Sequence, residues 1–214
     1  MSDGSRSPAE RGRTVRIGLT GPIGCGKSTI GRWLGDLGAV VVNADDIARR
    51  VTDVGEPALD EVVARFGGAY RRPDGSLDRA ALGRLVFSDG AALRDLEAIV
   101  HPAVRPRIEA AVAGAEAGGA PAVVVEAIKL IEAGYAAACD EVWLVTCDAK
   151  AQRRRLIGRG LPAEEADQRI VAQGDLTTRL GPRATRIVDT SGDSGATRRS
   201  VTEAWEAALE KPRS

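Results

Sequence analysis

Short apolar runs recur along the chain and alternate with stretches of helical periodicity. Five of these runs predict strands, at residues 15–20, 39–42, 122–125, 141–146 and 186–188. The second run is apolar throughout, a pattern typical of a parallel strand that is covered on both faces. Strands that alternate with helices predict an α/β fold with a parallel sheet of about five strands.

Two long segments interrupt this alternation. Residues 57–118 have helical periodicity and are too long for a plain crossover, so they are predicted to form a helical insertion. Residues 149–184 carry many arginines and are predicted to form a lid. The remaining segments would complete a single domain over residues 15–214, with its core at 15–56, 119–148 and 185–208. The polar start, residues 1–14, is predicted to be a disordered tail.

The segment after the first predicted strand carries the strongest chemical signal. It reads Gly21-Pro22-Ile23-Gly24-Cys25-Gly26-Lys27-Ser28-Thr29 and opens a predicted helix that reaches about Leu37. Gly-x4-Gly-Lys-Ser between a strand and a helix is the pattern of a P-loop, whose backbone N–H groups cradle phosphates. Lys27 is predicted to reach the β- and γ-phosphates of ATP as a catalytic cation, and Ser28 to be a Mg²⁺ ligand. The fold prediction therefore becomes a three-layer P-loop NTPase.

Two further residues stand where phosphoryl transfer needs them. Asp45 follows the second predicted strand at its carboxyl end, where open parallel sheets bind ligands, and its carboxylate can accept or orient the proton of an acceptor hydroxyl. The alternative is an N-cap of a helix over residues 47–51, and for Asp46 that alternative is favoured. Arg159 lies in a predicted turn of the lid and is expected to stabilise charge on the transferring phosphoryl group, although a solvated helix face is the ordinary role of such arginines.

Two other polar residues are weaker candidates. Glu126 ends an apolar strand, as the acidic residue beside the Mg²⁺ of P-loop proteins does, and we hypothesise that it orients a metal-bound water. The alternative for Glu126 is a salt bridge to Lys129. His101 is the only histidine and precedes Pro102 at a predicted first helical turn, where a cap or a packed polar residue is more common than a ligand contact.

Composition narrows the choice of partners and compartment. Basic and acidic residues both number 30, so no global field draws the chain to nucleic acid or anionic lipid, and any phosphate site is local. No stretch approaches the length of a membrane span, and we expect a cytoplasmic monomer that binds neither nucleic acid nor membrane. The chain has three cysteines, an odd number with no CxxC pair, which argues against a disulfide framework and for a reducing compartment.

The three cysteines differ in their predicted reactivity. Cys25 lies beside Lys27 at the start of a helix, where positive potential favours the thiolate, so it is predicted to be the most reactive. The alternative is that Cys25 only fills a position where serine or alanine would serve. Cys139 and Cys147 flank the strand at 141–146 and are predicted to be packed and inert.

Six sequence blocks, taken together with their order and spacing, resemble those of the bacterial dephospho-coenzyme A kinases. The resemblance runs from Ile17 to about Trp205. It rests on residues 18–29 (GLTGPIGCGKST), 43–49 (NADDIAR), 75–82 (GSLDRAAL), 96–102 (LEAIVHP), 170–173 (IVAQ) and 187–192 (IVDTSG). It implies that ATP phosphorylates the 3′-hydroxyl of the ribose of dephospho-coenzyme A, the last step of coenzyme A synthesis. It also implies that Asp45 is the base and that the acceptor is bound by Asp45, Arg49, Arg79 and His101.

The chain departs from this family at several points. Asn43 stands where the family usually has an aspartate, so Asp45 would act without a second carboxylate. The segment after the third strand carries Glu126 and Lys129 in place of the usual Pro-Leu-Leu pattern. A kinase for another small acceptor, such as a nucleotide, nucleoside or sugar acid, is an alternative. A GTP-hydrolysing switch is another, but the guanine-reading Asn-Lys-x-Asp is absent.

Overall fold

A computed structural model describes residues 13–210 of the 214-residue chain. The chain divides into two compact units. The sheet unit contains the described residues 13–42 and 112–210, and the helical unit contains residues 43–111. Of the tail predicted over residues 1–14, only the last two lie within the described residues. None of the described helices is long and apolar enough to cross a membrane.

The sheet unit is built on five strands in the order β2-β3-β1-β4-β5. The pairs β1–β3, β1–β4 and β4–β5 are parallel, as the alternation of strands and helices predicted. The strands are β1 (Val15–Thr20), β2 (Val40–Asn43), β3 (Ala122–Glu126), β4 (Glu141–Thr146) and β5 (Arg186–Asp189). Leu19 pairs with Glu126, so the carboxyl ends of β1 and β3 meet at one edge of the sheet.

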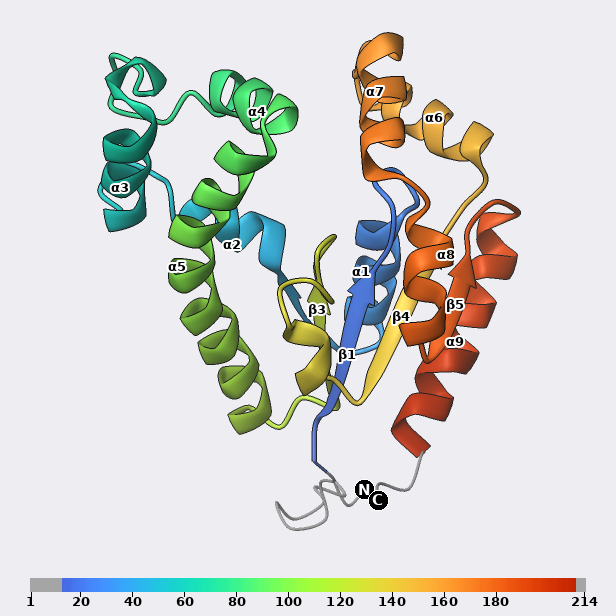
Figure 1. The fold of residues 1–214 in the computed structure, drawn as a ribbon. Helices are drawn as coiled ribbons and strands as arrows, with labels where there is room; N and C mark the ends of the chain where they lie inside the picture. Colours follow the sequence, from blue (N-terminus) through green and yellow to red (C-terminus); the bar gives the residue numbers. More distant parts are fainter. Residues whose placement is uncertain (1–12, 211–214) are drawn as a thin grey trace. The chain divides into compact units, whose positions relative to one another are not determined.

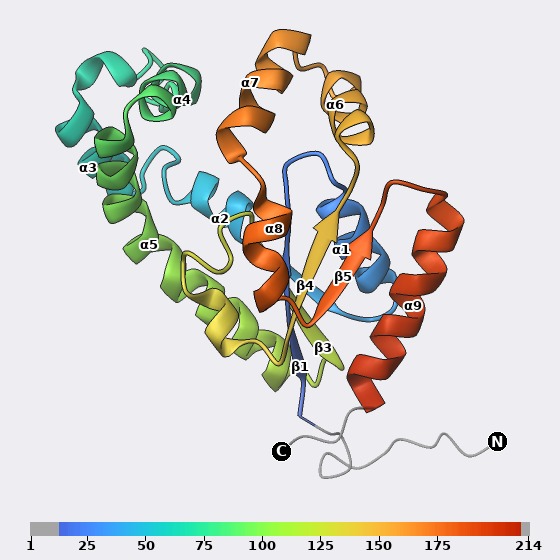
Figure 2. The ribbon, with the colours of Figure 1, turned by 45° about the vertical axis from the view of Figure 1, so that its right-hand side comes forward.

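Helices cover both faces of this sheet (Figures 1 and 2). Helices α1 (Lys27–Asp36) and α9 (Ser194–Glu210) pack on one face over a core that includes the fully buried Trp143. The neighbouring Leu144 points to the opposite face and packs against α8 (Leu176–Leu180). The sheet unit therefore has the three layers of the predicted fold.

Strand β2 differs from its prediction. It forms one edge of the sheet, and the side chains of Val40 and Val41 are 40% and 36% exposed. The expectation of a strand covered on both faces is therefore wrong. Only Val42 of this strand is buried. An unbroken apolar run can therefore also occur in a strand at the edge of a sheet.

The segment between β4 and β5 is the predicted lid, and it is helical. It contains α6 (Ala149–Gly158), α7 (Ala163–Gln173), α8 and the short 3₁₀ helix η3 (Gly181–Arg183). Asp148 caps α6 by accepting a hydrogen bond from the backbone N–H of Ala151 at 2.6 Å. A second short 3₁₀ helix of the sheet unit, η2 (Tyr135–Ala138), precedes β4.

The helical unit packs around its own small core. Its elements are α2 (Ala44–Arg50), α3 (Pro57–Phe66), η1 (Gly68–Tyr70), α4 (Arg79–Ser88) and the first part of α5 (Gly90–Ala117). Four buried side chains form its centre: Leu59, Val62, Leu77 and Leu82. The last residues of α5, 112–117, belong to the sheet unit.

Helix α5 corrects the expectation for His101. Sequence analysis placed His101 and Pro102 at the start of a helix, but both lie inside the 28-residue α5, together with Pro106. Each proline removes one backbone N–H from the helical hydrogen-bond ladder. The helix nevertheless continues, because Val104 and Ile108 on its next turns are buried. His101 is an exposed side chain of this helix.

Candidate active site

The P-loop connects β1 to α1, and its path depends on glycine at two positions. Gly21 has a φ of 144°, and a Cβ at this position would lie 2.1 Å from the backbone oxygen of Val145. Gly26 has a φ of 95° and is the N-cap of α1. Side chains rarely adopt either conformation, so both positions need glycine. The loop then delivers the first N–H groups of α1, which bind anions readily.

Lys27 is the first residue of α1 and lies within the loop that it follows. Its side chain is only 7% exposed. The Nζ atom donates hydrogen bonds to the backbone oxygens of Gly21 at 2.8 Å and Pro22 at 3.1 Å. The ammonium group therefore lies across the P-loop, where it adds a full positive charge to the helix N-terminus.

Ser28 and Glu126 form a hydrogen-bonded pair beside the P-loop. Ser28 Oγ donates to Glu126 Oε1 at 2.8 Å, and Glu126 is only 4% exposed. The other carboxylate oxygen faces α1, since a Cβ on Gly31 would lie 3.1 Å from Oε2. A hydroxyl and a carboxylate are the hard oxygen donors that Mg²⁺ prefers. No group of three or more His, Cys, Asp or Glu side chains in residues 13–210 could hold a metal ion.

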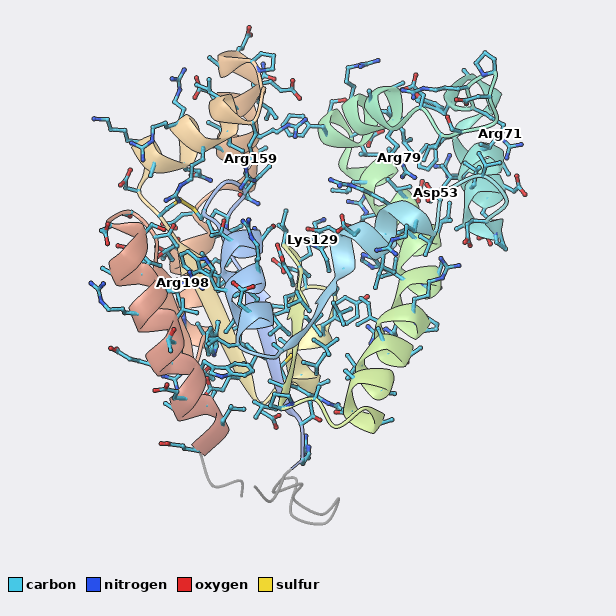
Figure 3. The ribbon with its side chains drawn as sticks, turned by 180° about the vertical axis from the view of Figure 1, so that it is seen from behind. Asp53, Arg71, Arg79, Lys129, Arg159 and Arg198 are labelled. Carbon is cyan, nitrogen blue, oxygen red and sulfur yellow. A yellow bond between two sulfur atoms is a disulfide. The ribbon has the colours of Figure 1, made fainter. Side chains whose placement is uncertain are left out.

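A pocket of about 430 Å³ opens beside the P-loop. It lies within the sheet unit, and its walls include Gly26, Trp33, Arg155, Arg159 and Thr190. Arg159 ends α6 as its C-cap, in the turn where sequence analysis placed it, and Figure 3 shows it at that end of the lid. Its guanidinium makes no hydrogen bond or ion pair with any residue in the described range 13–210. The pocket is within the size range of small-molecule sites.

Thr190 links the P-loop to α6, and no role for it was predicted from the sequence. Its hydroxyl donates to the backbone oxygen of Cys25 at 2.8 Å and lies 3.1 Å from that of Thr146. Arg155 donates to the Thr190 hydroxyl at 2.8 Å and to its backbone oxygen at 2.6 Å. Thr190 belongs to the block at 187–192 that resembles the family. Its contacts with Cys25 and Arg155 could not be predicted, because they join segments that only the fold brings together.

Two glutamines of the lid hold the P-loop at Ile23. Gln152 on α6 donates to the backbone oxygen of Ile23 at 2.8 Å, and Gln173 on α7 accepts from the Ile23 N–H at 2.8 Å. These contacts span 129 and 150 residues of sequence. In the sequence, Gln173 is only the end of a block that resembles the family, and Gln152 belongs to no such block. Neither contact with Ile23 could be predicted, because no local pattern indicates it.

The expectations for the cysteines are wrong in two respects. Cys25 is fully buried and is joined to Cys147 by a disulfide bond, although the odd cysteine count argued against one. Cys25 is therefore not an exposed reactive thiol. Cys147 packs against the core, as predicted, but the bond to Cys25 was not expected. The fold explains the error, because the P-loop turns the side chain of residue 25 toward the residue that follows β4. The third cysteine, Cys139, is a free thiol.

The remaining candidates lie in the helical unit, and α2 presents two of them. Asn43, not Asp45 or Asp46, caps α2: its Oδ1 accepts from the Asp46 N–H at 3.0 Å. The predicted capping role for Asp46 is therefore wrong. Asp45 stands in the first turn of α2, two residues beyond the last residue of β2. Arg49 is exposed and pairs with Asp46 at 3.5 Å.

Arg79 is the first residue of α4 and binds the end of α2 (Figure 3). Its guanidinium donates to the hydroxyl of Thr52 at 2.7 Å, the backbone oxygen of Arg49 at 2.6 Å and the carboxylate of Asp53 at 2.8 Å. It thereby adds to the hydrogen bonds that the Arg49 carbonyl accepts from the N–H and the hydroxyl of Thr52. This structural role was not visible in the sequence.

Comparisons with known proteins place the chain in a family. The sequence profile of the family "Dephospho-CoA kinase" matches residues 15–195. The chain is 48% identical to a dephospho-CoA kinase of Symbiobacterium thermophilum, over 90% of this chain and 80% of that one. It is 46% identical to a dephospho-CoA kinase of Moorella thermoacetica, over 89% of this chain and 90% of that one.

A solved structure shares the fold of this chain. A crystal structure of a Thermus thermophilus protein superposes with a TM-score of 0.79 at 34% identity, covering 93% of this chain and all of that one. The profile match covers most of the described residues, and the two relatives match over 80% and 90% of their own length. The chain belongs to the dephospho-CoA kinase family.

Proposed function

We infer that this chain is an ATP-dependent dephospho-CoA kinase, which transfers the terminal phosphoryl group of ATP to the 3′-hydroxyl of dephospho-coenzyme A. The products are coenzyme A and ADP. The observation that carries this inference is the P-loop with the buried Lys27 beside the Ser28–Glu126 pair, in a chain of this family. Phosphoryl transfer requires positioning and charge stabilisation more than covalent chemistry, and this arrangement supplies both.

The donor nucleotide is assigned to the P-loop and the pocket beside it. Residues Gly21 to Thr29 would hold the phosphates through backbone N–H groups, and Lys27 would contact the β- and γ-phosphates. The pocket would take the purine, and Arg159, which lines the pocket, would then lie next to the nucleotide. A planar guanidinium can stack on a purine ring. That Arg159 also stabilises the transferring phosphoryl group stays a prediction.

Mg²⁺ is proposed to bind at Ser28. The hydroxyl of Ser28 would be a direct ligand, and Glu126 would hold that hydroxyl through the hydrogen bond at 2.8 Å and orient metal-bound water. The ion, when bound with the nucleotide, would neutralise charge on the phosphates. The absence of a three-ligand protein site in residues 13–210 fits an ion that shares its coordination with phosphates and water.

The acceptor is proposed to be bound by residues of the helical unit. Asp45 would accept the proton of the acceptor hydroxyl, because it follows β2 at the carboxyl end where parallel sheets bind ligands. Arg49, Arg79 and His101 would contact the acceptor. We propose one kinase domain over residues 15–214, acting in the cytoplasm as a monomer on small molecules, with an acceptor insertion at 57–118 and a lid at 149–184.

A coupled assay of ADP release with a panel of acceptors tests this assignment. With ATP and Mg²⁺, dephospho-coenzyme A should be turned over, and adenosine, nucleoside monophosphates and sugar acids should give rates near background. The Lys27→Ala variant is the matched control for contaminating kinases. The assignment is wrong if another acceptor is phosphorylated efficiently while dephospho-coenzyme A is not.

A further inference from the structure

The disulfide joins two segments that are far apart in the sequence. Cys25 and Cys147 are separated by 122 residues, and their Cα atoms lie 5.2 Å apart. Cys25 lies inside the P-loop and has no accessible surface, whereas Cys147 directly follows β4 and is partly exposed. A small reagent would therefore meet the sulfur of Cys147 first. Neither sulfur has a part in the proposed phosphoryl transfer.

The bond runs parallel to non-covalent links between the P-loop and the lid. Cys147 precedes Asp148, the N-cap of α6. One turn further along α6, Gln152 holds Ile23 of the P-loop. The next turn carries Arg155, which binds Thr190, whose hydroxyl in turn binds the backbone oxygen of Cys25. The disulfide is thus the covalent member of a set of contacts between the P-loop and the start of α6.

We propose that Cys25 and Cys147 form a thiol–disulfide exchange site that reacts with small disulfides, and that the oxidised pair slows turnover. The thiolate of Cys147 attacks one sulfur of a small disulfide RSSR, which forms a mixed disulfide and releases RS⁻. The thiolate of Cys25 then attacks the sulfur of Cys147 and releases the second RS⁻. Two protein thiols are oxidised to one disulfide while RSSR is reduced to two thiols, and excess thiol reverses both steps.

Cys139 provides an internal contrast. Its Sγ donates to the backbone oxygen of Tyr135 at 3.4 Å. Burial, together with the negative charge of Asp140, raises the pKa of the Cys139 thiol to about 11. Only the thiolate attacks disulfides, so Cys139 is almost entirely unreactive at neutral pH. A small disulfide should therefore oxidise Cys25 and Cys147 and leave Cys139 as a free thiol.

Oxidation affects turnover because α6 carries part of the pocket wall. Arg155 and Arg159 on this helix line the pocket beside the P-loop. A covalent bond just before the N-cap of α6 limits how far the start of this helix can move from the P-loop. Lid opening and product release often limit kcat in kinases, so we expect kcat to fall about threefold to tenfold in the oxidised form.

The chemical step is tested by thiol mapping on the whole protein. The protein is equilibrated at pH 7.5 in mixtures of reduced and oxidised glutathione, quenched with acid, unfolded, alkylated and mapped by mass spectrometry. Cys25 and Cys147 should lose free thiol together in a two-electron curve, while Cys139 stays alkylatable. In Cys25→Ser, glutathione should accumulate on Cys147. The proposal is overturned if Cys25 and Cys147 stay free over the whole range, or if glutathione attaches only to Cys139.

The effect on turnover is tested by comparing oxidised and reduced enzyme in the ADP-release assay. Wild type and Cys139→Ser should lose turnover about threefold to tenfold on oxidation and regain it with dithiothreitol. Cys147→Ser should keep the activity of the reduced wild type and ignore the oxidant, and a thermal melt checks that it is folded. Unchanged turnover in oxidised wild type, or equal sensitivity in a folded Cys147→Ser, would refute the regulatory effect. Thiol mapping does not depend on turnover. A negative mapping result would therefore refute the exchange site without affecting the kinase assignment.

Discussion

The P-loop and the helical unit hold their candidate residues by different means. In the P-loop, positions are set by the backbone: Gly21 and Gly26 adopt conformations that other residues avoid, and Lys27 follows from them. In the helical unit, side chains hold one another, as Arg79 holds the end of α2 and Arg49 pairs with Asp46. The fixed spacing of a sequence motif therefore predicts the P-loop arrangement. The side-chain contacts of the helical unit can be seen only in the folded chain.

This difference implies different consequences of mutation. The P-loop backbone sets the positions of its residues, so replacing one of their side chains should act mainly on the rate. Arginines that bind other parts of the helical unit support structure, so their replacement should act on stability as well as on acceptor binding. The following variants test that contrast, beginning with the largest expected effect.

Asp45→Asn should have the largest effect on turnover. The substitution keeps the size of the side chain but removes the basic carboxylate, and loss of a general base costs about 10²- to 10⁴-fold in kcat. ATP binding should be largely unchanged, because Asp45 is proposed to act on the acceptor. Titration of a fluorescent ATP analogue alongside the rate measurement separates the two effects. Parallel loss of ATP binding would indicate a structural or metal-binding role instead.

Lys27→Ala should reduce turnover by about 10²-fold or more, since it removes the cation that is proposed to contact the transferred phosphate. A thermal melt is recorded alongside the rate, because the buried Nζ atom also donates hydrogen bonds to the Gly21 and Pro22 backbone oxygens, and their loss should lower the midpoint by a few degrees. Lys27→Arg is the matched variant, which keeps the charge but changes its geometry. If Lys27→Ala retained wild-type activity, the P-loop assignment would fall.

Glu126→Gln should have a smaller effect, which appears in the metal dependence of the rate. The amide still accepts a hydrogen bond from Ser28 but carries no charge, and loss of such an outer ligand typically weakens metal binding about 10- to 100-fold. The Mg²⁺ concentration for half-maximal rate should rise, and excess Mg²⁺ should restore most of kcat. An unchanged Mg²⁺ titration would rule out the metal role of Glu126.

The sequence predicted those parts of the molecule that depend on local patterns. The five-stranded parallel sheet and the family resemblance are confirmed, because strand–helix alternation and the P-loop spacing are both short-range signals. The edge position of β2 was missed, since an apolar run does not say whether neighbours cover it. The continuous α5 was missed because proline normally ends a helix, and burial of Val104 and Ile108 overrides that preference.

The sequence could not predict contacts between distant segments. The Cys25–Cys147 bond spans 122 residues, and nothing near either cysteine marks the other as its partner. The same holds for Gln152 and Gln173, which reach Ile23 from two different helices. Roles of Asp45, Arg49, Arg79 and His101 toward the acceptor stay predictions, because they depend on a bound substrate.

Arg79→Ala should have the smallest effect on kcat, with its effect appearing in stability and in KM for the acceptor, and it tests the contrast most directly. The Arg79–Asp53 ion pair is substantially exposed and contributes little by itself. The hydrogen bonds to Thr52 and the Arg49 carbonyl are each worth about 1 kcal/mol, so the variant should lose about 2 kcal/mol of stability. For a chain of this length that corresponds to a fall of about 4–8 °C in the midpoint of a calorimetric melt. Arg79→Lys should recover only part of it, because lysine lacks the fork that reaches both acceptors. If the melt is unchanged while KM for the acceptor rises by about 10²-fold, the loss of more than 2 kcal/mol of acceptor binding would make Arg79 a substrate contact rather than a support for α2.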